Sequence, residues 1–383
     1  MADEACAGSN RSRMKKLTEE EVLALSEEYN LADGHAYRGW NNAEAAIIEA
    51  VGDTFRRVDR RDRGKIEADY LDSFFTLARQ TRRADRFEFF LCFTASTAIE
   101  VVANYLRINR LSVALIEPCF DNLYDILARH DVPLRVFPES MMEAEAEVLA
   151  GFLQSISSDA IFLVSPNNPT GTRLFRENLA RIVDFCRTRQ KLLILDATFR
   201  FYLPDSDVYD QYQLLGDADI DCILIEDTGK TWPTLELKAP FFAVSSRLAG
   251  PIARIYADFL LHVSPVAVAL MTDFLRLPRE HGLGHIRDVI GANRRILYGD
   301  LRGTFLQPVE AGYMSVAWLK ILAPMSAREL KDELARGSVH VLAGNQFFWS
   351  VPERGDSFIR IALSRDTSMF RRASRRLGEL CRP

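Results

Sequence analysis

The chain has 383 residues, 48% of them hydrophobic and 26% charged, which is enough to bury a substantial core in two lobes. Its formal net charge is only −5 and no basic tract is interleaved with aromatic residues, so nucleic-acid binding has no support in the sequence. The longest apolar stretch, 259–271, contains His262 and is too short to cross a bilayer, so we expect no membrane span.

The first 16 residues are polar and rich in small side chains, which indicates a disordered leader without a signal peptide. The six cysteines show no pairs at metal-ligand spacing, and several lie inside apolar runs: Cys6, Cys92, Cys119, Cys186, Cys222 and Cys381. We therefore expect reduced thiols, no metal site and a cytoplasmic protein.

A short amphipathic helix is predicted at the start of the ordered chain, with Leu17, Val22 and Leu25 as its apolar contacts. Thr18 and Glu21 have the spacing of a capping box, and helix capping by itself would explain this pair.

The next motif is Asp33-Gly34-His35, in which glycine supports a turn. An aspartate before glycine is usually a turn residue and a lone histidine is usually structural. The motif therefore carries no function by itself.

Strands and helices then alternate, as in a sheet covered by helices on both faces. The strands predicted for this sheet are 88–92, 113–117, 134–137, 160–164, 192–195, 222–225 and 241–244, and the helices between them include 96–106, 121–129 and 177–189. Strands 313–319, 339–343 and 358–363 are predicted for a smaller lobe, followed by a final helix with 371–376 on its solvated face. The expected division is an N-terminal lid or part of the small domain (1–50), a large domain (51–280) and a C-terminal small domain (281–383), with a break near 278–284.

Two residues at strand ends indicate cofactor chemistry. Lys230 follows the apolar strand 222–225, and Asp196 ends the apolar run 191–196. The carboxyl ends of parallel strands meet in one crevice, where a lysine that forms an imine and an aspartate beside a pyridinium nitrogen suit pyridoxal phosphate (PLP). Singly, the lysine would be a solvated loop residue and the aspartate a helix N-cap.

Residues 160–171 are predicted to form a buried strand that runs into a turn, and turn chemistry would explain their Asn, Pro and Gly. With Asp196 and Lys230 following in this order, the string Asn167-Asn168-Pro169-Thr170-Gly171 resembles the fold-type I aminotransferase-like enzymes. The resemblance extends from about residue 87 to 364. It implies an α/β fold with a mainly parallel seven-stranded sheet between helices, a small α+β lobe, PLP as cofactor and a homodimer.

The same resemblance assigns roles to single residues. Lys230 resembles the imine-forming lysine, Asp196 the partner of the pyridine nitrogen, and Asn168 the donor to the phenolic oxygen. Arg360 resembles the arginine that binds the substrate α-carboxylate, for which its planar fork is suited. Further cofactor contacts are implied for the stacking ring of Phe120, for Thr198, and for phosphate-binding residues: Ala95, Ser96, Thr97 and Lys238. On their own, Phe120 would be a core residue and the Ser/Thr pair an N-cap.

Asp227 departs from the aminotransferase pattern. This position, three before Lys230, usually carries a Ser or Thr that binds the cofactor phosphate, and Lys238 stands where an arginine is usual. Because a carboxylate would repel a phosphate, Asp227 needs another partner, and a cationic substrate is a natural one.

A subgroup resemblance supplies such a substrate. Thr18, Glu21 and the strings 32–36, 119–122, 196–200 and 226–234 are similar to those of the oxygen- and PLP-dependent arginine oxidases of enduracididine-type and azole antibiotic pathways. This similarity implies oxidation of L-arginine, or a close guanidino amino acid, by dioxygen as co-substrate to 4-hydroxy-2-ketoarginine and 2-ketoarginine. It places Thr18 and Glu21 among the substrate contacts, puts Glu21, Asp33 and Asp227 around the guanidinium, and gives His35 a catalytic role in the later steps.

Other outcomes remain open from the sequence. An arginine desaturase that releases a dehydroarginine would use the same residues, as would a plain aminotransferase or a capreomycidine-type cyclase. A PLP-binding regulator or inactive partner is the non-enzymatic alternative, although Lys230, Asp196, Asn168 and Arg360 are intact. The product ratio, and whether hydroxyarginine is the true substrate, are not encoded in any motif.

Overall fold

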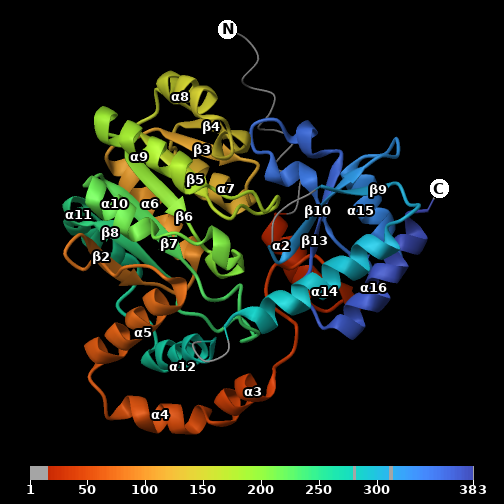
Figure 1. Ribbon diagram of the computed structural model, residues 1–383, viewed down its shortest axis with the longest axis horizontal. Coiled ribbons are helices and arrows are strands. Elements are labelled where there is room, and N and C mark those ends of the chain that lie inside the picture. Colours follow the sequence, from red (N-terminus) through yellow and green to blue (C-terminus); the bar gives the residue numbers. More distant parts are fainter. Residues whose placement is uncertain (1–15, 279–281, 310–313, 383) are drawn as a thin grey trace.

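The computed structural model describes residues 16–278, 282–309 and 314–382. A large lobe is built on a seven-stranded sheet and a smaller lobe on a four-stranded sheet, and the two lie side by side (Figure 1). The predicted leader and Cys6, the residues 279–281 at the predicted interdomain break, and Tyr313 of a predicted strand lie outside the described residues. The division at residues 50 and 280 therefore stays a prediction.

The sheet of the large lobe is mainly parallel. Its strands are, in spatial order, β2 (Phe87–Leu91), β8 (Phe241–Ser245), β7 (Cys222–Glu226), β6 (Leu192–Asp196), β5 (Ala160–Val164), β3 (Val113–Glu117) and β4 (Leu134–Pro138). Only β8 runs against its neighbours β7 and β2. All seven predicted strands are confirmed to within one residue at either end. The predicted α/β class with a mainly parallel sheet is confirmed as well.

Burial explains why these strands are recognisable in the sequence. Every residue of β3, β5, β6, β7 and β8 is buried, so each forms a continuous apolar run. The edge strands β2 and β4 are only partly buried, as edge positions require.

Helices cover both faces of this sheet. The right-handed crossover rule puts α6 (Ala95–Ile108) and α7 (Asp121–Arg129) on one face, because their connections run in one direction along the sheet. The connections in the opposite direction put α8 (Ala146–Ser155), α9 (Arg176–Arg189) and α10 (Gln211–Ala218) on the other face. α11 (Ser246–Phe259) packs against α6, and α5 (Arg63–Ala78) packs against α12 (Pro265–Arg276).

The smaller lobe differs from the prediction in detail. Its sheet has the order β12 (Leu342–Ala343), β13 (Phe358–Ala362), β10 (Val316–Ile321) and β9 (Leu306–Val309), and its helices are α14 (Gly284–Asp300), α15 (Ala327–Arg336) and α16 (Thr367–Leu380). The single strand predicted over 339–343 is wrong. Residues Val339–His340 form β11, which pairs in parallel with β1 (Tyr29–Asn30), whereas β12 pairs with β13. Strand β9 was not predicted.

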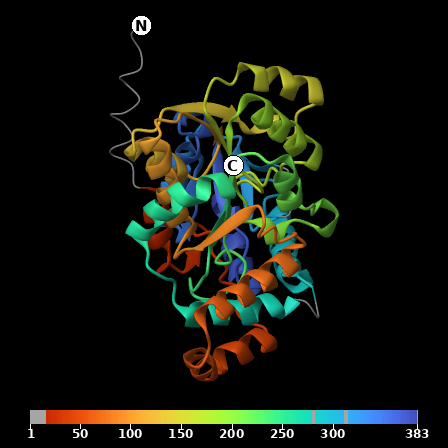
Figure 2. The same ribbon diagram turned by 90° about the vertical axis from the view of Figure 1, so that its left-hand side faces the viewer.

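The N-terminal segment joins the two lobes. Helix α2 (Leu17–Ala24) lies between them, in contact with α7 of the large lobe and β12 of the small lobe (Figure 1). Helices α3 (Asn42–Glu49) and α4 (Val51–Asp59), which were not predicted, extend along one end of the molecule beside α12 (Figure 2).

Two expectations for α2 are wrong. Leu17 is buried as predicted, but Val22 and Leu25 are 59% and 44% exposed, because the helix docks through Leu17, Glu21 and Ala24. The capping box does not use Thr18 and Glu21: the helix begins at Leu17, and the Lys16 N–H donates to Glu19 Oε2 at 2.9 Å.

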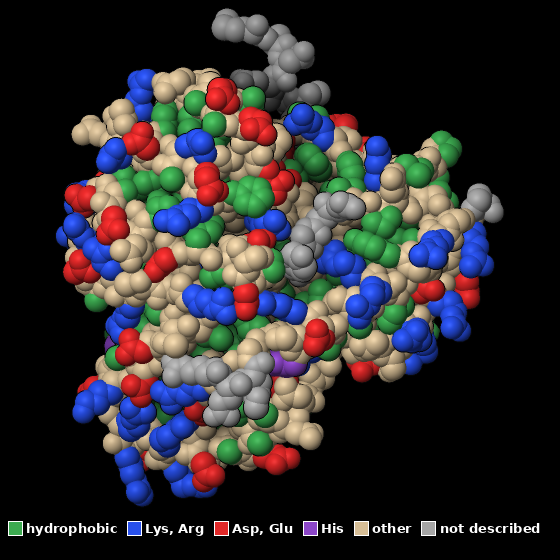
Figure 3. Space-filling view, viewed as in Figure 1, with side chains coloured by type: hydrophobic (Ala, Val, Ile, Leu, Met, Phe, Trp, Pro, Cys, Tyr) green, Lys and Arg blue, Asp and Glu red, His purple; other side chains and the backbone are tan. Residues whose placement is uncertain are grey.

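No helix among the described residues is long and apolar enough to span a membrane. The five described cysteines are buried and none forms a disulfide. On the face shown in Figure 3, lysine and arginine side chains alternate with aspartate and glutamate side chains.

Candidate active site

The loop between β7 and β8 carries three of the predicted residues. Because β8 returns antiparallel to β7, Lys230 and Lys238 both lie at the carboxyl edge of the parallel strands. A Cβ atom at Gly229 would lie 2.6 Å from Lys238 Cδ, so only glycine lets the Lys238 side chain pass this close. The Tyr202 hydroxyl donates to the Lys230 carbonyl oxygen and so fixes the backbone at the lysine.

The neighbouring strand, β6, ends at the buried carboxylate of Asp196. Its Oδ1 accepts hydrogen bonds from the Thr198 N–H at 2.9 Å and from the Thr198 hydroxyl. Burial raises the pKa of Asp196 to about 6; the bonds from Thr198 oppose the rise and the nearby charge of Asp227 adds to it. This carboxylate is poised to exchange a proton with a basic nitrogen placed beside it.

Arg360, on β13, reaches into the site from the small lobe and is completely buried. Its Nη1 donates to Asn168 Oδ1 at 3.3 Å, and its Nη2 donates to Glu21 Oε1 at 3.0 Å and to the Ala32 carbonyl oxygen. Its Nε has no partner among the described residues. Arg360 therefore binds a carboxylate in this structure, and that carboxylate is the chain's own Glu21.

Residues 32–36 form a strap across the loop that carries Lys230. His35 Nδ1 lies 2.7 Å from Asp33 Oδ1, and His35 Nε2 lies 3.3 Å from Lys230 Nζ and 3.5 Å from Lys238 Nζ. Although burial pushes the pKa of Asp33 upward, the hydrogen bonds and charge of His35 and the charge of Lys230 hold it below its usual value. The Asp33 carboxylate accepts a hydrogen bond from His35 Nδ1 and so orients the imidazole with Nε2 toward Lys230.

The strap occupies the space between Lys230 and Arg360. A Cβ atom at Gly34 would lie 3.7 Å from both Arg360 Nη1 and Glu21 Oε1 and 3.9 Å from Lys230 Nζ. The Gly34 N–H also donates to Glu21 Oε1 at 3.2 Å. A substrate whose amine approaches Lys230 while its carboxylate reaches Arg360 must therefore displace both Glu21 and Gly34.

The predicted phosphate cradle is the first turn of α6. This helix begins at Ala95, one residue before the predicted start at Ser96, and Thr94 is its N-cap. Ala95, Ser96 and Thr97 are then the residues whose N–H groups point out of a helix N-terminus, which favours a bound anion. Thr97 N–H is already bonded to Thr94 Oγ1 at 3.0 Å.

Phe120 and Asn122 lie at the start of α7, and Asn122 links α7 to the first turn of α6. Phe120 is the N-cap residue of α7, and its ring lies 6.1 Å from that of Phe347 in an edge-to-face contact. Asn122 Nδ2 donates to Ser96 Oγ at 2.9 Å.

The acids predicted around a guanidinium have separate partners in the structure. Glu21 is bound to Arg360 and Asp33 to His35, whereas the buried Asp227 accepts the Gly229 N–H at 2.8 Å. Thr18 lies exposed on the first turn of α2 and is not brought into this group. Its substrate contact stays a prediction.

Several residues at the site were missed by the sequence analysis. Arg365 donates to the carbonyl oxygens of Asn30, Asp33 and His35 and so holds the strap. A carboxylate oxygen of Glu236 lies within 4.8 Å of a carboxylate oxygen of Asp33 and of a ring nitrogen of His35. The Tyr37 hydroxyl donates to Glu236 Oε1 at 3.3 Å. A buried arginine whose partners lie far away in the chain has no local signature, but an acid between Lys230 and Lys238 was visible in the sequence.

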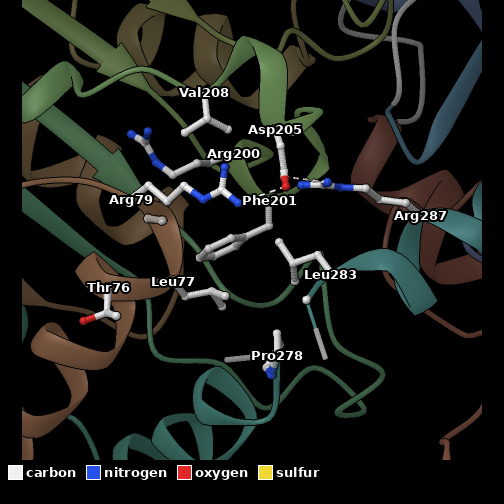
Figure 4. A pocket seen from close by; sticks show the side chains of 12 residues that line it. Thr76, Leu77, Arg79, Arg200, Phe201, Asp205, Val208, Pro278, Leu283 and Arg287 are labelled. Carbon is white, nitrogen blue, oxygen red and sulfur yellow. Dashed lines mark hydrogen bonds and ion pairs between the residues drawn. The ribbon is translucent and has the colours of Figure 1, made fainter. Parts of the chain in front are cut away.

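A separate cavity of about 400 Å³ lies between α5, the segment after β6 and the start of α14 (Figure 4). Asp205 stands in it between Arg79 and Arg287, which donate to its carboxylate at 2.9 and 2.8 Å. None of the residues that line this cavity is a predicted site residue.

The comparisons with known proteins agree with this geometry. Residues 83–377 match the family described as aminotransferase class I and II. The chain belongs to this family. As a class I/II aminotransferase-family protein, it is an enzyme of the PLP-dependent superfamily with the fold-type I architecture.

Among solved structures, MppP soaked with the product 2-ketoarginine superimposes with a TM-score of 0.84 at 31% identity, over 92% of this chain and 99% of that one. The α-aminoadipate aminotransferase LysN of Thermus thermophilus shares the fold, with a TM-score of 0.77 at 16% identity over 98% and 96%. The LL-diaminopimelate aminotransferase of Arabidopsis thaliana is 30% identical over 74 residues, or 18% of this chain. That match spans only 16% of the plant protein's own length.

The described residues fit the PLP of this family. Lys230 offers a primary amine at the carboxyl end of β7, and Asp196 offers a buried carboxylate with a raised pKa beside it in the sheet. The first turn of α6 and Lys238 supply donors suited to a phosphate.

Proposed function

We propose that this enzyme oxidises L-arginine with dioxygen and releases 4-hydroxy-2-ketoarginine, 2-ketoarginine or both. The likeness to MppP, which was soaked with its product 2-ketoarginine, supports arginine as the substrate, since it extends over 92% of this chain. The acids Glu21, Asp33 and Asp227 are all buried, and they support a substrate with a cationic end.

One observation carries the proposal: a second base stands beside the lysine. His35 Nε2 lies 3.3 Å from Lys230 Nζ, and Asp33 orients the imidazole from the other side. Transfer of an amino group needs proton movement only near the substrate Cα, which one lysine performs. Addition of water further along the side chain needs another base, and a histidine oriented by a carboxylate is suited to that step.

The residues around Cα have simple tasks. PLP, when bound, supplies the electron sink for a carbanion at the substrate Cα. Lys230 removes the Cα proton, and Asp196 holds a proton at the ring nitrogen, which strengthens that sink. Asn168, whose Oδ1 accepts the Arg360 Nη1–H, would donate from its amide nitrogen to the phenolic oxygen of the bound ring.

Substrate binding exchanges partners at Arg360. The substrate α-carboxylate replaces Glu21 on the guanidinium of Arg360, because both are carboxylates and Glu21 holds only one Nη atom. Glu21 is then available, with Asp33 and Asp227, to bind the guanidinium of the substrate. His35, released from the lysines as the strap moves, activates a water molecule for attack at C4.

The proposed reaction balances with hydrogen peroxide as the reduced product. L-arginine, one dioxygen and one water give 2-ketoarginine, ammonia and one hydrogen peroxide. A second dioxygen and a second water give the 4-hydroxy product and a second hydrogen peroxide. A desaturase would stop before the addition of water at C4 and use the same residues.

Transamination is the second candidate function. Its support is the family itself and the short matches to LL-diaminopimelate aminotransferases, which span 50 to 92 residues in three of these relatives. The buried acids Glu21, Asp33 and Asp227 argue against diaminopimelate as its substrate, because the distal end of diaminopimelate carries a carboxylate beside its ammonium group.

Dependence on the electron acceptor separates the two functions. The PLP-loaded enzyme is given L-arginine either in air without a keto acid or under argon with excess 2-oxoglutarate. We expect turnover in air alone. Turnover only with 2-oxoglutarate, accompanied by glutamate, would replace the proposed oxidase by an aminotransferase.

A further inference from the structure

Asp121 is a buried carboxylate that the proposed mechanism does not use. It is the first residue of α7, directly after Phe120. Its Oδ2 accepts the Leu17 N–H at 2.8 Å across a separation of 104 residues, and its Oδ1 has no partner among the described residues. The carboxylate thus bonds to the first residue of α2, not to the backbone of its own helix.

Leu17 is the first residue of α2, so its N–H is one of the donors that a helix leaves unpaired at its start. A carboxylate at this place also faces the positive end of the α2 dipole. Asp121 therefore satisfies a donor of α2 from the large lobe, and in its ionised form it also supplies a favourable charge.

The other side of α2 belongs to the small lobe. Leu17 and Ala24 are buried in a cluster with Trp318, Leu342 and Phe347, apart from the main core. α2 is thus held from both lobes, and Asp121 is the buried polar link on the side of the large lobe.

The consequence for the site follows from helix geometry. Glu21 lies four residues after Leu17, on the same face of α2. Its carboxylate contacts Arg360 at 3.0 Å and the Gly34 N–H at 3.2 Å. The bond at Leu17 therefore fixes the position of α2 along its axis and its rotation about that axis, and with them the position of the Glu21 carboxylate.

Burial of this carboxylate is costly. Desolvation raises the pKa of Asp121 to about 7, with the charges of Asp125 and Glu21 acting in the same direction and the Leu17 N–H and Lys16 opposing them. The structure offers no compensating second bond for Oδ1 in the described residues. A position that only needed to start α7 would be served by an exposed acid.

We infer that Asp121 is a positioning residue, which holds α2 across the site and thereby sets Glu21 for its exchange between Arg360 and the substrate. The inference deepens the proposed function, since it rests on that function for the identity of the substrate. The docking of α2 itself does not depend on which substrate is used.

The test compares Asp121→Ala and Asp121→Asn with a matched control, Asp125→Asn. Asp125 lies one turn further along α7 and its carboxylate is 3.1 Å from the half-exposed Lys16 Nζ, so that ion pair contributes little. Hydrogen–deuterium exchange of residues 17–25 is measured in the PLP-loaded, substrate-free enzyme, followed by KM and kcat for L-arginine.

We expect exchange of residues 17–25 to rise roughly tenfold or more in Asp121→Ala, less in Asp121→Asn and by less than about twofold in Asp125→Asn. Exchange in β3 should stay unchanged, and KM should rise more than kcat falls. Unchanged exchange in Asp121→Ala, or an equal rise in the Asp125 control, would overturn the inference.

If Asp121→Ala does not fold, the comparison of Asp121→Asn with Asp125→Asn decides by the same criterion. Exchange is measured without substrate, so it separates the two claims. If exchange in α2 rises in the Asp121 variants but the wild-type enzyme does not oxidise L-arginine, the inference is supported and the proposed function is overturned. If the wild-type enzyme oxidises L-arginine but exchange in α2 is unchanged in the Asp121 variants, the proposed function is supported and the inference is overturned.

Discussion

Buried carboxylates with different partners set the chemistry of single residues in this enzyme. Asp196 is bonded to the neutral Thr198, Asp33 is bonded to His35, and Glu21 is bonded to Arg360. In the proposed function, the same functional group would serve as a proton partner for the cofactor ring at Asp196, as the group that orients a base at Asp33, and as the occupant of the substrate-carboxylate position at Glu21.

Asp196→Asn should stabilise the apoenzyme while abolishing turnover. The pKa of folded Asp196, about 6, lies above its usual value of 3.8, so its contribution to stability is full below about pH 4 and is lost as the pH rises to 6. At pH 8 the variant should gain up to about 3 kcal/mol in free energy of unfolding. Asparagine keeps an acceptor for Thr198. Urea unfolding of both apoproteins at pH 4 and pH 8 tests this, and an equal difference at both pH values would contradict it.

Asp227→Asn should weaken the binding of L-arginine but not that of L-citrulline, its uncharged isostere. If Asp227 faces the guanidinium, the variant should bind L-arginine more weakly by roughly 2 to 4 kcal/mol, the usual cost of removing one partner of a buried charge pair. Asparagine can still accept the Gly229 N–H, so the loop should keep its shape. Binding of L-citrulline, which has an uncharged end, should change little. Equal losses for both ligands in a titration would assign Asp227 to the cofactor or to folding.

At the scale of elements, the strap of residues 32–36 contacts both lobes of the molecule at the site. It is held by Arg365 on the side of the small lobe and meets the two lysines through His35. A segment that fills the substrate position in one state and completes the site in another is a natural place for a water-activating base.

His35→Ala should change the products and leave the first step intact. The variant keeps Lys230 and Asp196, so it should still consume oxygen with L-arginine. Because a general base contributes roughly 10² to 10⁴ in rate, the products should move from 4-hydroxy-2-ketoarginine toward 2-ketoarginine. Product masses give the ratio. An unchanged ratio would make His35 structural, and loss of oxygen consumption would assign it to substrate binding.

All seven strands of the large sheet were predicted to within one residue, and complete burial made five of them especially easy to recognise. β3, β5, β6, β7 and β8 are buried throughout, so their limits and the residues at their ends, Asp196 and Lys230, were found directly. The helix α2, at the edge of the site, was harder to predict from the sequence. α2 has eight residues and docks through Leu17, Glu21 and Ala24, and this face was hidden by apolar side chains that point outward.

Other parts depended on contacts that no local pattern encodes. Residues 339–343 resemble one strand in the sequence, but Val339–His340 pair with β1 and Leu342–Ala343 pair with β13. Roles for Asp121, Arg365 and Glu236 arise from contacts across 104, 330 and 199 residues of chain. Their residue types alone carry no such information.

At the scale of the whole molecule, we predict a homodimer, as fold-type I enzymes usually place their sites at a two-fold interface. Phe93 and Ile108, at the two ends of α6, are both more than half exposed. Phe93→Glu should therefore shift the mass in light scattering toward the monomer and weaken PLP retention.

The control for the dimer is Val148→Glu. Val148 is equally exposed but lies on α8, on the opposite face of the large sheet from α6. It should leave the mass unchanged. A fully active wild-type monomer in solution would contradict the assembly.

The central claim is that this site passes the electrons of L-arginine to dioxygen. The most direct measurement is oxygen uptake by the PLP-loaded enzyme with L-arginine as sole substrate, with the products identified by mass in the same sample. The account predicts one dioxygen consumed per 2-ketoarginine and two per 4-hydroxy-2-ketoarginine, each with one ammonia. Arginine consumed without oxygen uptake, or oxygen uptake that L-arginine does not stimulate, would contradict it.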